Sequence, residues 1–317
     1  MDKHEISPPI DNMEVDKLST FWNEIFGIDL IPDLPKDVFL GSENAYNTIK
    51  VFYYSEENSI ISTCATVTSN NINILGGLAE VATHKRFRGN GFAKDLCDKA
   101  LDKFFTNKGQ ALFLGTSNPI AEKLYIKLGW QKIHNSNVLV NINSNIPYKE
   151  FSINYFKDEY IISIDEANPS ARIPIIPLTI YPHRSELLDS NINIYSTKYH
   201  NQSSCMGLYN KFNILKKEHN GSWFVAKTKS GKIVGISTSK LIDYKTYNID
   251  GFAHPNFNKN IDLLINKSIK WCINQGAEKI TAQSNINDFI KQSIFEKLNF
   301  RKDPNIKKNN KIYYLYK

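Results

Sequence analysis

The spacing of hydrophobic residues predicts that the chain begins with one helix followed by three strands. Across residues 14–26, apolar side chains recur at the three- and four-residue intervals of an amphipathic helix. Residues 49–54 and 59–68 are rich in β-branched and aromatic residues and flank the polar turn 55–58, a pattern typical of a hairpin. A third strand is predicted to run to Thr83.

The remainder of the first half alternates between helices and strands. It is predicted to contain a glycine-rich turn, a helix, a strand, a short helix that begins after Asn118, and a strand pair near residues 131–141. Residues 141–147 are polar and rich in turn formers, as expected of a linker. We therefore predict two domains, at residues 1–146 and 147–317.

The second half repeats the order of elements predicted for the first. The corresponding residues are separated by a constant offset of 170 (257 − 87 = 170): Phe87 with Phe257, His84 with His254, and Leu128-Gly129-Trp130 with Leu298-Asn299-Phe300. Internal similarity at a fixed spacing indicates a duplication. The predicted fold class is therefore α/β of the α+β type, with two similar domains in tandem, each a mixed and mostly antiparallel sheet flanked by helices.

Composition is that of a globular intracellular protein. Of the 317 residues, 41% are hydrophobic and 22% charged, which excludes a disordered chain. The four cysteines form no Cys-x-x-Cys pair, so no metal site is expected, and free cysteines suit a reducing cytoplasm. Because we find neither a signal peptide nor a membrane-spanning run, we predict a cytoplasmic protein without a membrane partner.

The net charge of +7 and the isoelectric point near 9.0 raise the question of nucleic-acid binding. The lysines are scattered along the chain and do not form the basic patch that a nucleic acid requires. Nucleic acid is therefore an unlikely partner. A small polyanion needs only a local group of positive charges.

The turn Arg86-Phe87-Arg88-Gly89-Asn90-Gly91-Phe92-Ala93 lies between a predicted strand and a predicted helix. Its two glycines permit positive φ and a close approach of the backbone, and the N–H groups at the helix start point toward any bound anion. Two arginines add charge-assisted donors. The turn is neither a Walker A motif nor a dinucleotide-binding fingerprint, because the residues that define those motifs are missing.

The spacing Arg-x-x-Gly-x-Gly after a strand resembles motif A of the GNAT superfamily of acyl-CoA-dependent N-acyltransferases, in which this turn holds the pyrophosphate of coenzyme A. Residues 118–130 resemble a later motif of that family, a short helix that carries a tyrosine and ends at Leu-Gly-aromatic. Asn118 fits the helix N-cap, and Gly129 fits its left-handed C-terminal position. The resemblance covers residues 49–140.

The resemblance implies that acetyl-CoA or another short acyl-CoA binds along the third strand and the turn, with an amine attacking the thioester directly. The implied cofactor-binding residues are Val81, Thr83, Arg86, Arg88, Gly89, Asn90, Gly91, Phe92, Ala93 and Asn118. The implied catalytic residues are Tyr125, which would protonate the leaving thiolate, and Glu80, which would take a proton from the amine.

The residues alone leave alternatives to these roles. Tyr125 has the helical spacing of a half-buried core residue. Strand alternation places Glu80 on the face opposite Val81, and so away from the cofactor, unless a bulge intervenes. Asn118 is accounted for as a helix cap alone. Trp22 is a candidate for the lining of an acceptor pocket, although core packing is its commoner role.

The second domain lacks the residues that make the turn an anion site. At the matching positions it carries Asn256, Asn258, Lys259 and Ile261 in place of two arginines and two glycines, and Phe295 in place of Tyr125. A β-branched residue at the second glycine position would keep the backbone away from a phosphate. The second domain is therefore predicted to be a degenerate copy that shapes the substrate cleft or stabilises the first domain.

Two classes of function follow. The first is an enzyme that transfers an acetyl group from acetyl-CoA to a primary amine of a small molecule such as an amino sugar, polyamine, amino acid or antibiotic; a protein N-terminus or lysine is the second choice of acceptor. The alternative is a non-catalytic acyl-CoA sensor or partner-binding protein. The intact turn together with Tyr125 favours the enzyme. The tandem arrangement is compatible with a monomer or a homodimer.

Overall fold

The computed structural model describes residues 1–27, 33–302 and 310–316, which form two compact units. The first unit consists of Met1–Ile133, Asn137–Phe151 and Ser203–Gly207, and the second of the remaining residues. The chain thus leaves the first unit near Phe151 and returns to it for the short segment Ser203–Gly207. The sequence-based boundary at residue 146 did not include this return.

The first unit is built on a sheet of seven strands in the order β1-β2-β3-β4-β5-β7-β6. Only β4 and β5 pair in parallel; every other neighbouring pair is antiparallel. The strands are β1 (Asp2–Ile6), β2 (Asn47–Glu56), β3 (Ser59–Ser69), β4 (Leu75–Thr83), β5 (Ala111–Gly115), β6 (Gln131–Lys132) and β7 (Val138–Ile142). All except β1 lie where the hydrophobic pattern predicts strands.

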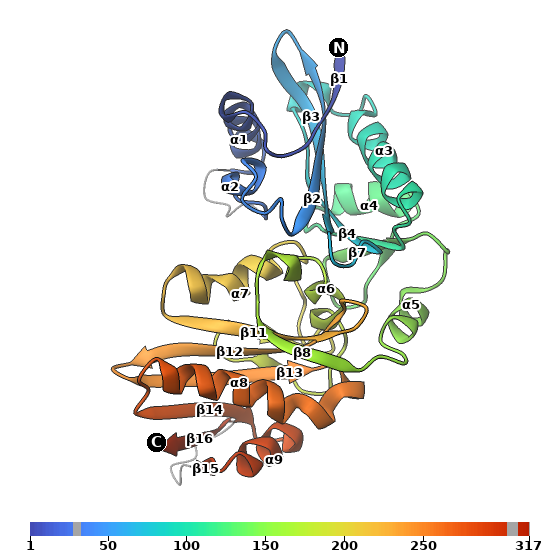
Figure 1. Cartoon of the computed structure of the whole chain (residues 1–317). Coiled ribbons are helices and arrows are strands. Elements are labelled where there is room, and N and C mark those ends of the chain that lie inside the picture. Colours follow the sequence, from blue (N-terminus) through green and yellow to red (C-terminus); the bar gives the residue numbers. More distant parts are fainter. Residues whose placement is uncertain (28–32, 303–309, 317) are drawn as a thin grey trace. The chain divides into compact units, whose positions relative to one another are not determined.

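Helices cover both faces of this sheet, with α1 and α2 on one side and α3 and α4 on the other (Figure 1). Local capping residues define their ends. Asp11 accepts a hydrogen bond from Met13 N (2.8 Å) at the start of α1, and Asn118 accepts one from Ile120 N (2.9 Å) at the start of α4. Gly129 follows α4 with φ 83°. The helices are α1 (Asn12–Phe26), α2 (Lys36–Phe39), α3 (Phe92–Thr106) and α4 (Pro119–Lys127).

The core of the first unit lies between α3, α4 and the sheet. It includes Phe52 and Cys64 from the sheet, Cys97 from α3, and Tyr125 from α4, and each of these side chains is at most 5% exposed. Because α4 packs into this core through Tyr125, the tyrosine is fixed in position next to β4 and β5, where the two parallel strands end.

The second unit has a sheet with the same strand order and the same pattern of orientations, β8-β11-β12-β13-β14-β16-β15, in which only β13 and β14 are parallel. Its strands are β8 (Ile161–Glu166), β11 (Gly221–Thr228), β12 (Ile233–Asp243), β13 (Thr246–Ala253), β14 (Lys279–Asn285), β15 (Arg301–Lys302) and β16 (Asn310–Tyr316). A separate pair, β9 (Leu187–Asp189) and β10 (Ile194–Tyr195), completes the described strands.

Helices α8 (Ile261–Asn274) and α9 (Phe289–Lys297) lie on one side of the second sheet, and α6 (Ile175–Thr179) and α7 (Leu208–Lys217) on the other (Figure 1). Helix α5 (Tyr148–Tyr155) crosses the boundary between the units in sequence. Elements α5, α6, α7 and β8 to β10 were not predicted. The α+β fold with two mixed sheets flanked by helices was predicted and is confirmed.

Backbone geometry repeats at the 170-residue offset. His84 and His254 each follow a strand and accept a hydrogen bond, from Arg86 N and Asn256 N respectively, as caps of the short 3₁₀ helices Lys85–Phe87 and Pro255–Asn260. At the ends of α4 and α9, Gly129 and Asn299 both adopt positive φ, at 83° and 66°. These parallels support the duplication that the sequence indicates.

Candidate functional site

A bulge in β4 turns Glu80 into the interior of the first unit. The register between β3 and β4 shifts so that Glu80 and Val81 together oppose Cys64, and Glu80 has φ 51°. The Glu80 carbonyl accepts a hydrogen bond from Thr63 Oγ1 (2.6 Å). Thr63 Oγ1 in turn accepts one from Trp22 Nε1 (2.9 Å), which ties the bulge to α1. The bulge therefore overrides the simple alternation that would place Glu80 opposite Val81.

The bulge opens onto a cavity of about 410 Å³, here named the β4 cavity. Its walls come from α1, β4, β5, the start of α4 and the returning segment Ser203–Ser204, all within the first unit. Glu80 and Tyr125 both line it, so the two residues predicted to be catalytic share one cavity. Trp22 also lines it, and is both a core residue and a wall of the pocket.

The Glu80 carboxyl has few partners in this cavity. The side chain is 9% exposed, and among the described residues its one hydrogen bond is donated by Leu34 N to Oε1 at 3.4 Å. Burial and then the negative charge of Asp33 raise the pKa of Glu80 to about 8, and the Leu34 hydrogen bond opposes the rise. A carboxyl of this kind exchanges a proton near neutral pH, as a general base or acid must.

Tyr125 presents its ring to the same space from α4. Its ring centroid lies 5.7 Å from that of Trp130, and the residue is 5% exposed. Burial, followed by the neighbouring thiols of Cys97 and Cys64, raises the pKa of the Tyr125 hydroxyl well above its ordinary value. The hydroxyl is therefore protonated at neutral pH and is suited to donate a proton.

The glycine-rich turn follows β4 directly. Gly89 and Gly91 both adopt φ 83°, and a Cβ atom at either position would meet no atom within 4 Å. Glycine is favoured at these two positions because of their positive φ, and not because a larger side chain would clash with a neighbouring atom. Gly91 is the N-cap of α3 in the left-handed conformation. The Arg88 side chain is exposed, and its Nε donates to the Thr83 carbonyl (3.1 Å).

The turn borders a second, mostly apolar cavity of about 560 Å³, here named the turn cavity. Eight of the ten residues predicted to bind the cofactor line it: Val81, Thr83, Arg88, Gly89, Gly91, Phe92, Ala93 and Asn118. Arg86 and Asn90 are exposed on the turn and do not line it; Asn90 Nδ2 donates to Phe87 O (3.2 Å). Tyr125 lines both cavities, so the cavity that the turn borders and the cavity that Glu80 lines share this residue.

Sequence reasoning missed Asp33 and the returning segment Ser203–Gly207. A Cβ atom on Gly115 would lie 3.0 Å from Ser204 Cα, and one on Gly207 would lie 2.9 Å from Asp33 Oδ1. The segment is thus closely packed against the end of β5 and against Asp33. No local sequence pattern predicts that a segment returns to a domain from far along the chain. The only related signal is the glycine at positions 115 and 207, where the segment packs closely.

The corresponding region of the second unit has neither the strand bulge nor the left-handed helix N-cap of the first. The register of β12 and β13 is regular through Asp250, which stands 170 residues after Glu80. The 3₁₀ helix Pro255–Asn260 leads directly into α8, and Asn260, at φ −110°, replaces the left-handed glycine N-cap. Ile261 is buried at the helix start. No positive-φ residue lies among residues 254–261, so this turn has no geometry comparable to that of residues 89–91.

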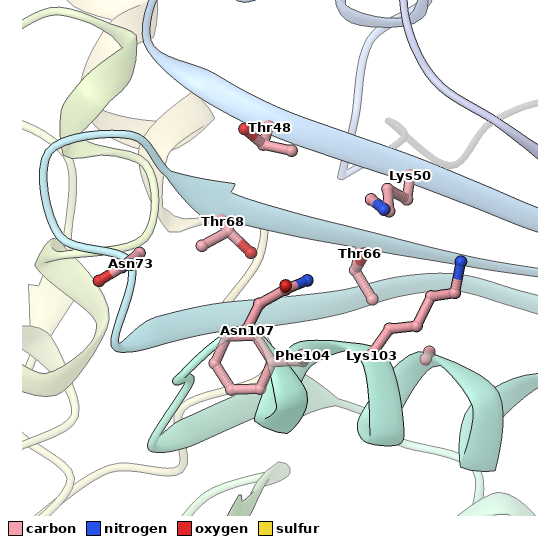
Figure 2. A pocket seen from close by; sticks show the side chains of 9 residues that line it. Thr48, Lys50, Thr66, Thr68, Asn73, Lys103, Phe104 and Asn107 are labelled. Carbon is pink, nitrogen blue, oxygen red and sulfur yellow. The ribbon is translucent and has the colours of Figure 1, made fainter.

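A third hollow in the first unit, of about 220 Å³, lies between the sheet and the end of α3 (Figure 2). Thr48 and Lys50 come from β2, Thr66 and Thr68 from β3, and Lys103, Phe104 and Asn107 from the α3 side. Glu5 forms ion pairs with both Lys50 and Lys103. The hollow contains no carboxylate among its lining residues, and its two lysines both pair with Glu5, so it is a weaker candidate for catalysis.

Other observations limit the chemistry. Among residues 1–27, 33–302 and 310–316, no group of three His, Cys, Asp or Glu side chains is arranged to hold a metal ion. In the same part of the chain, no helix has the length and apolar character needed to cross a membrane.

Residues 38–149 match the family described as acetyltransferase (GNAT) domain. The first unit therefore contains a GNAT acetyltransferase domain, as the resemblance implied. The match ends at residue 149 and does not assign residues 150–317 to a family. No curated protein matches the sequence at a significant level.

Among solved structures, the chain is similar to ribosomal-protein-S5-alanine acetyltransferase from Vibrio fischeri, at 14% identity over 50% of this chain and 96% of that one, with a TM-score of 0.40. It is also similar to N-acetyltransferase PseH of Campylobacter jejuni in complex with acetyl coenzyme A, at 18% identity over 34% of this chain and 79% of that one, with a TM-score of 0.30. A variant of spermidine N-acetyltransferase SpeG from Vibrio cholerae is similar at 14% identity over 36% of this chain and 76% of that one, with a TM-score of 0.32.

Proposed function

We propose that the first unit is an acyl-CoA-dependent N-acyltransferase that transfers an acetyl group from acetyl-CoA to a primary amine of a small molecule. The observation that carries this proposal is that Tyr125 lines both the cavity bordered by the glycine-rich turn and the cavity lined by Glu80, a buried carboxyl with a pKa of about 8. A GNAT acetyltransferase domain at residues 38–149 supports acetyl-CoA as the donor.

In this proposal the turn cavity holds the coenzyme A moiety. The N–H groups at the start of α3 and the Arg88 guanidinium face the pyrophosphate, with Arg86 as a further positive charge on the turn. Val81 and Thr83 of β4 lie beside the pantetheine arm, with Asn118 opposite them at the start of α4. The thioester then lies near Tyr125, where the two cavities meet.

The amine attacks the thioester directly in a ternary complex. Glu80 takes a proton from the incoming ammonium, and the C–N bond forms at the thioester carbonyl. Backbone N–H groups near Val81 stabilise the negative charge that develops on the carbonyl oxygen. When the C–S bond breaks, Tyr125 donates a proton to the departing thiolate, and the second proton that the nitrogen loses on becoming an amide restores the Tyr125 hydroxyl. The products are the amide, free coenzyme A and the proton on Glu80, which passes to solvent. Binding of both reactants in adjoining cavities supplies the alignment.

We further propose that the second unit, which makes up most of the predicted domain 147–317, is a GNAT-like copy that does not bind acyl-CoA. Its regular β13, its missing left-handed N-cap and the buried Ile261 support this. Calorimetry with acetyl-CoA is then expected to give one site per chain. Two equivalent sites would contradict the proposal.

The test of activity is thiol release from acetyl-CoA in the presence of a panel of primary amines, with mass analysis of the acylated product. Amine-dependent thiol release that Glu80→Gln strongly reduces is the expected result. Acetyl-CoA binding without turnover on any small amine or peptide N-terminus would favour the alternative of an acyl-CoA-sensing protein. Turnover confined to peptides would favour a protein N-acetyltransferase.

A further inference from the structure

The face of the sheet that packs against α3 in the first unit changes from apolar to polar along β2 and β3. Phe52 and Cys64 are paired across these strands and belong to the buried core. Side chains two residues apart share a face of a strand. The next two cross-strand pairs on this face are both polar: Lys50 with Thr66, and Thr48 with Thr68. A sheet face beneath a helix is usually apolar, so core packing does not account for this polar stretch.

The hollow of about 220 Å³ lies between this polar stretch and the C-terminal end of α3. Figure 2 shows the side chains of Lys103 and Asn107 on the α3 side of the hollow, across from the threonines of the strands. Its volume of about 220 Å³ is many times the ~10–15 Å³ that one water molecule requires, so a small molecule fits. Among the described residues, it shares no lining residue with the β4 cavity or the turn cavity, and it is therefore a separate site.

Thr66 is the most enclosed polar side chain of this hollow. It is 6% exposed, and its Oγ1 forms no hydrogen bond with any residue in the described part of the chain. The side-chain amides of Asn73 and Asn107 also line the hollow and have no hydrogen-bond partner within residues 1–27, 33–302 and 310–316. A buried hydroxyl without a partner is unfavourable, and a ligand that bonds to it removes this cost.

Three lysines beside the hollow share one carboxylate. Glu5 of β1 forms ion pairs with Lys50 (3.4 Å), Lys99 (3.3 Å) and Lys103. Burial opposes the ionisation of Glu5, but the hydrogen bonds from Lys103 and Lys99 outweigh it and lower the pKa of Glu5, so this carboxyl is charged. One negative charge among three positive charges leaves an excess of two positive charges. Lys50 and Lys103 line the hollow, whereas Glu5 does not, so a ligand meets the ammonium groups directly.

We propose that this hollow binds a small phosphorylated polyol, with the phosphate between Lys50 and Lys103. A phosphate monoester carries about −1.5 to −2 charges at neutral pH, which matches the excess of the lysine cluster, whereas one carboxylate would match about half of it. Its oxygen atoms accept charge-assisted hydrogen bonds from the ammonium groups. This inference does not depend on the proposed N-acyltransferase function, because the hollow is separate from both cavities that serve it.

The polyol is placed at the other end of the hollow. Asn107 is the C-cap of α3, where the helix dipole disfavours an anion and favours a hydrogen-bond donor. Hydroxyl groups both donate and accept hydrogen bonds, as do the threonine hydroxyls and asparagine amides in the lining. The two ends therefore select the two parts of the ligand, and a polyol without phosphate or a phosphate without hydroxyls satisfies only one of them.

Calorimetric titration of the whole protein with glycerol 3-phosphate, inorganic phosphate and glycerol tests this. Glycerol 3-phosphate is expected to bind about tenfold more tightly than phosphate, on the scale of one or two additional hydrogen bonds, and glycerol is expected to show no binding. Lys103→Met is expected to weaken the binding of both phosphates by about tenfold or more, because it removes a charge-assisted donor. Lys17→Met removes an exposed lysine that pairs with Glu14 outside the hollow, and is expected to change neither affinity.

Thr66 gives the sharper test because valine has nearly the same shape. Thr66→Val is expected to weaken glycerol 3-phosphate binding by about five- to tenfold, the scale of one hydrogen bond, and to leave the unfolding midpoint of the free protein unchanged or higher. Thr66→Ser retains the hydroxyl and is expected to bind nearly as wild type does. A lower affinity in a variant of undiminished stability separates a bound hydroxyl from a merely structural one.

The glycine-rich turn is another anion site, so each titration is repeated in Arg88→Ala. Glycerol 3-phosphate binding is expected to persist in this variant. Binding that Arg88→Ala abolishes but Thr66→Val and Lys103→Met leave intact would locate the ligand on the turn and overturn the inference. Equal affinities for glycerol 3-phosphate and phosphate, or no binding of glycerol 3-phosphate to the folded protein at millimolar concentration, would also overturn it. None of these results bears on acetyl-CoA turnover, which tests the proposed function by itself.

Discussion

Glu80 in β4 and Asp250 in β13 occupy matching places in the two units, yet their surroundings are opposite. Glu80 projects from a bulge into a cavity and receives one long hydrogen bond. Asp250 is fully buried in a regular strand, where Lys291 Nζ donates to its Oδ1 at 2.6 Å and Ser190 N donates to Oδ2 at 2.8 Å. The first carboxyl is left able to exchange protons, whereas the second is fixed as part of an ion pair.

A residue of the helix beside each carboxyl contributes to this difference. Lys291 in α9 stands 170 residues after Ala121 in α4, and Ala121 lines both cavities of the first unit. The small alanine leaves space, whereas the lysine side chain fills the corresponding space and also donates to the Leu188 carbonyl (2.7 Å). This difference at one helix position adds to the bulge that β4 has and β13 lacks at Asp250, and together they distinguish an open site with a high-pKa acid from a closed core.

The largest expected effect comes from removing the proton acceptor of the open site. Glu80→Gln is expected to lower kcat/KM by about 10²–10⁴-fold, the range of general acid–base catalysis, with acetyl-CoA affinity nearly unchanged. Steady-state thiol release beside a direct binding measurement checks it. The matched variant Asp250→Asn, in the closed site, is expected to leave the turnover of folded protein unaltered. Equal losses in both variants would remove the distinction between the two carboxyls.

Substitutions in the closed site around Asp250 are expected to lower the free energy of unfolding. Lys291→Met leaves Asp250 buried without its cation, and loss of one partner of a buried ion pair costs about 3–5 kcal/mol. Denaturant unfolding followed by the fluorescence of Trp223 and Trp271, which lie in the second unit, measures it. Adding Asp250→Asn to this variant is expected to restore part of the loss. A double variant no more stable than Lys291→Met would show that the pair itself is not the cause.

The pH dependence of stability gives a further contrast. Because the folded protein holds the Glu80 proton up to about pH 8, whereas an ordinary glutamate carboxyl has a pKa of 4.5, the free energy of unfolding falls as pH rises between these values. Glu80→Gln removes this dependence. Its stability relative to wild type is therefore expected to improve by ~2–4 kcal/mol between pH 5 and 8. A flat difference across this range would mean that Glu80 titrates normally.

Much of the first unit was predictable because its signals are local. The cap of α4 at Asn118, the left-handed Gly129 and the positive-φ glycines of the turn all follow from residue type and spacing. The 170-residue repeat was equally readable, and the caps formed by His84 and His254 agree with it.

The features that define the open site were harder to predict because they depend on distant partners. Alternation along β4 left the direction of Glu80 open, and the bulge is fixed by Thr63 on another strand, which is itself bonded to Trp22. Asp33 reaches the cavity beside a segment that returns from residues 203–207. No spacing rule relates such residues.

Phe295 in α9 is the counterpart of Tyr125 in α4, so a phenylalanine already packs at the matching position of the second unit. The ring centroids of Phe295 and Phe300 lie 5.5 Å apart, much as those of Tyr125 and Trp130 lie 5.7 Å apart. Tyr125→Phe is therefore expected to fold normally and to lower kcat toward the lower end of the ~10²–10⁴-fold general-acid range, with acyl-CoA affinity nearly intact. Turnover at saturating substrates measures it. Wild-type turnover, with chemistry confirmed as the slow step, would assign Tyr125 to the core alone.

The smallest expected effect distinguishes the two arginines of the turn, which the second unit replaces with Asn256 and Asn258. Arg88 lines the turn cavity and is oriented by its Nε bond to the Thr83 carbonyl, whereas Arg86 is exposed and lies outside the lining. Arg88→Ala is expected to weaken acetyl-CoA binding by ~1–3 kcal/mol, the scale of a charge-assisted hydrogen bond.

Arg86→Ala is the matched control, and is expected to weaken binding less. Because both side chains are exposed, both losses should shrink as salt is added, and the Arg86 loss should shrink to a greater degree if it acts only through the long-range field. Calorimetric titration with acetyl-CoA at low and high salt measures all four values. Equal losses for the two variants at low salt would mean that orientation by Thr83 gives Arg88 no advantage, and that the turn acts through its total charge.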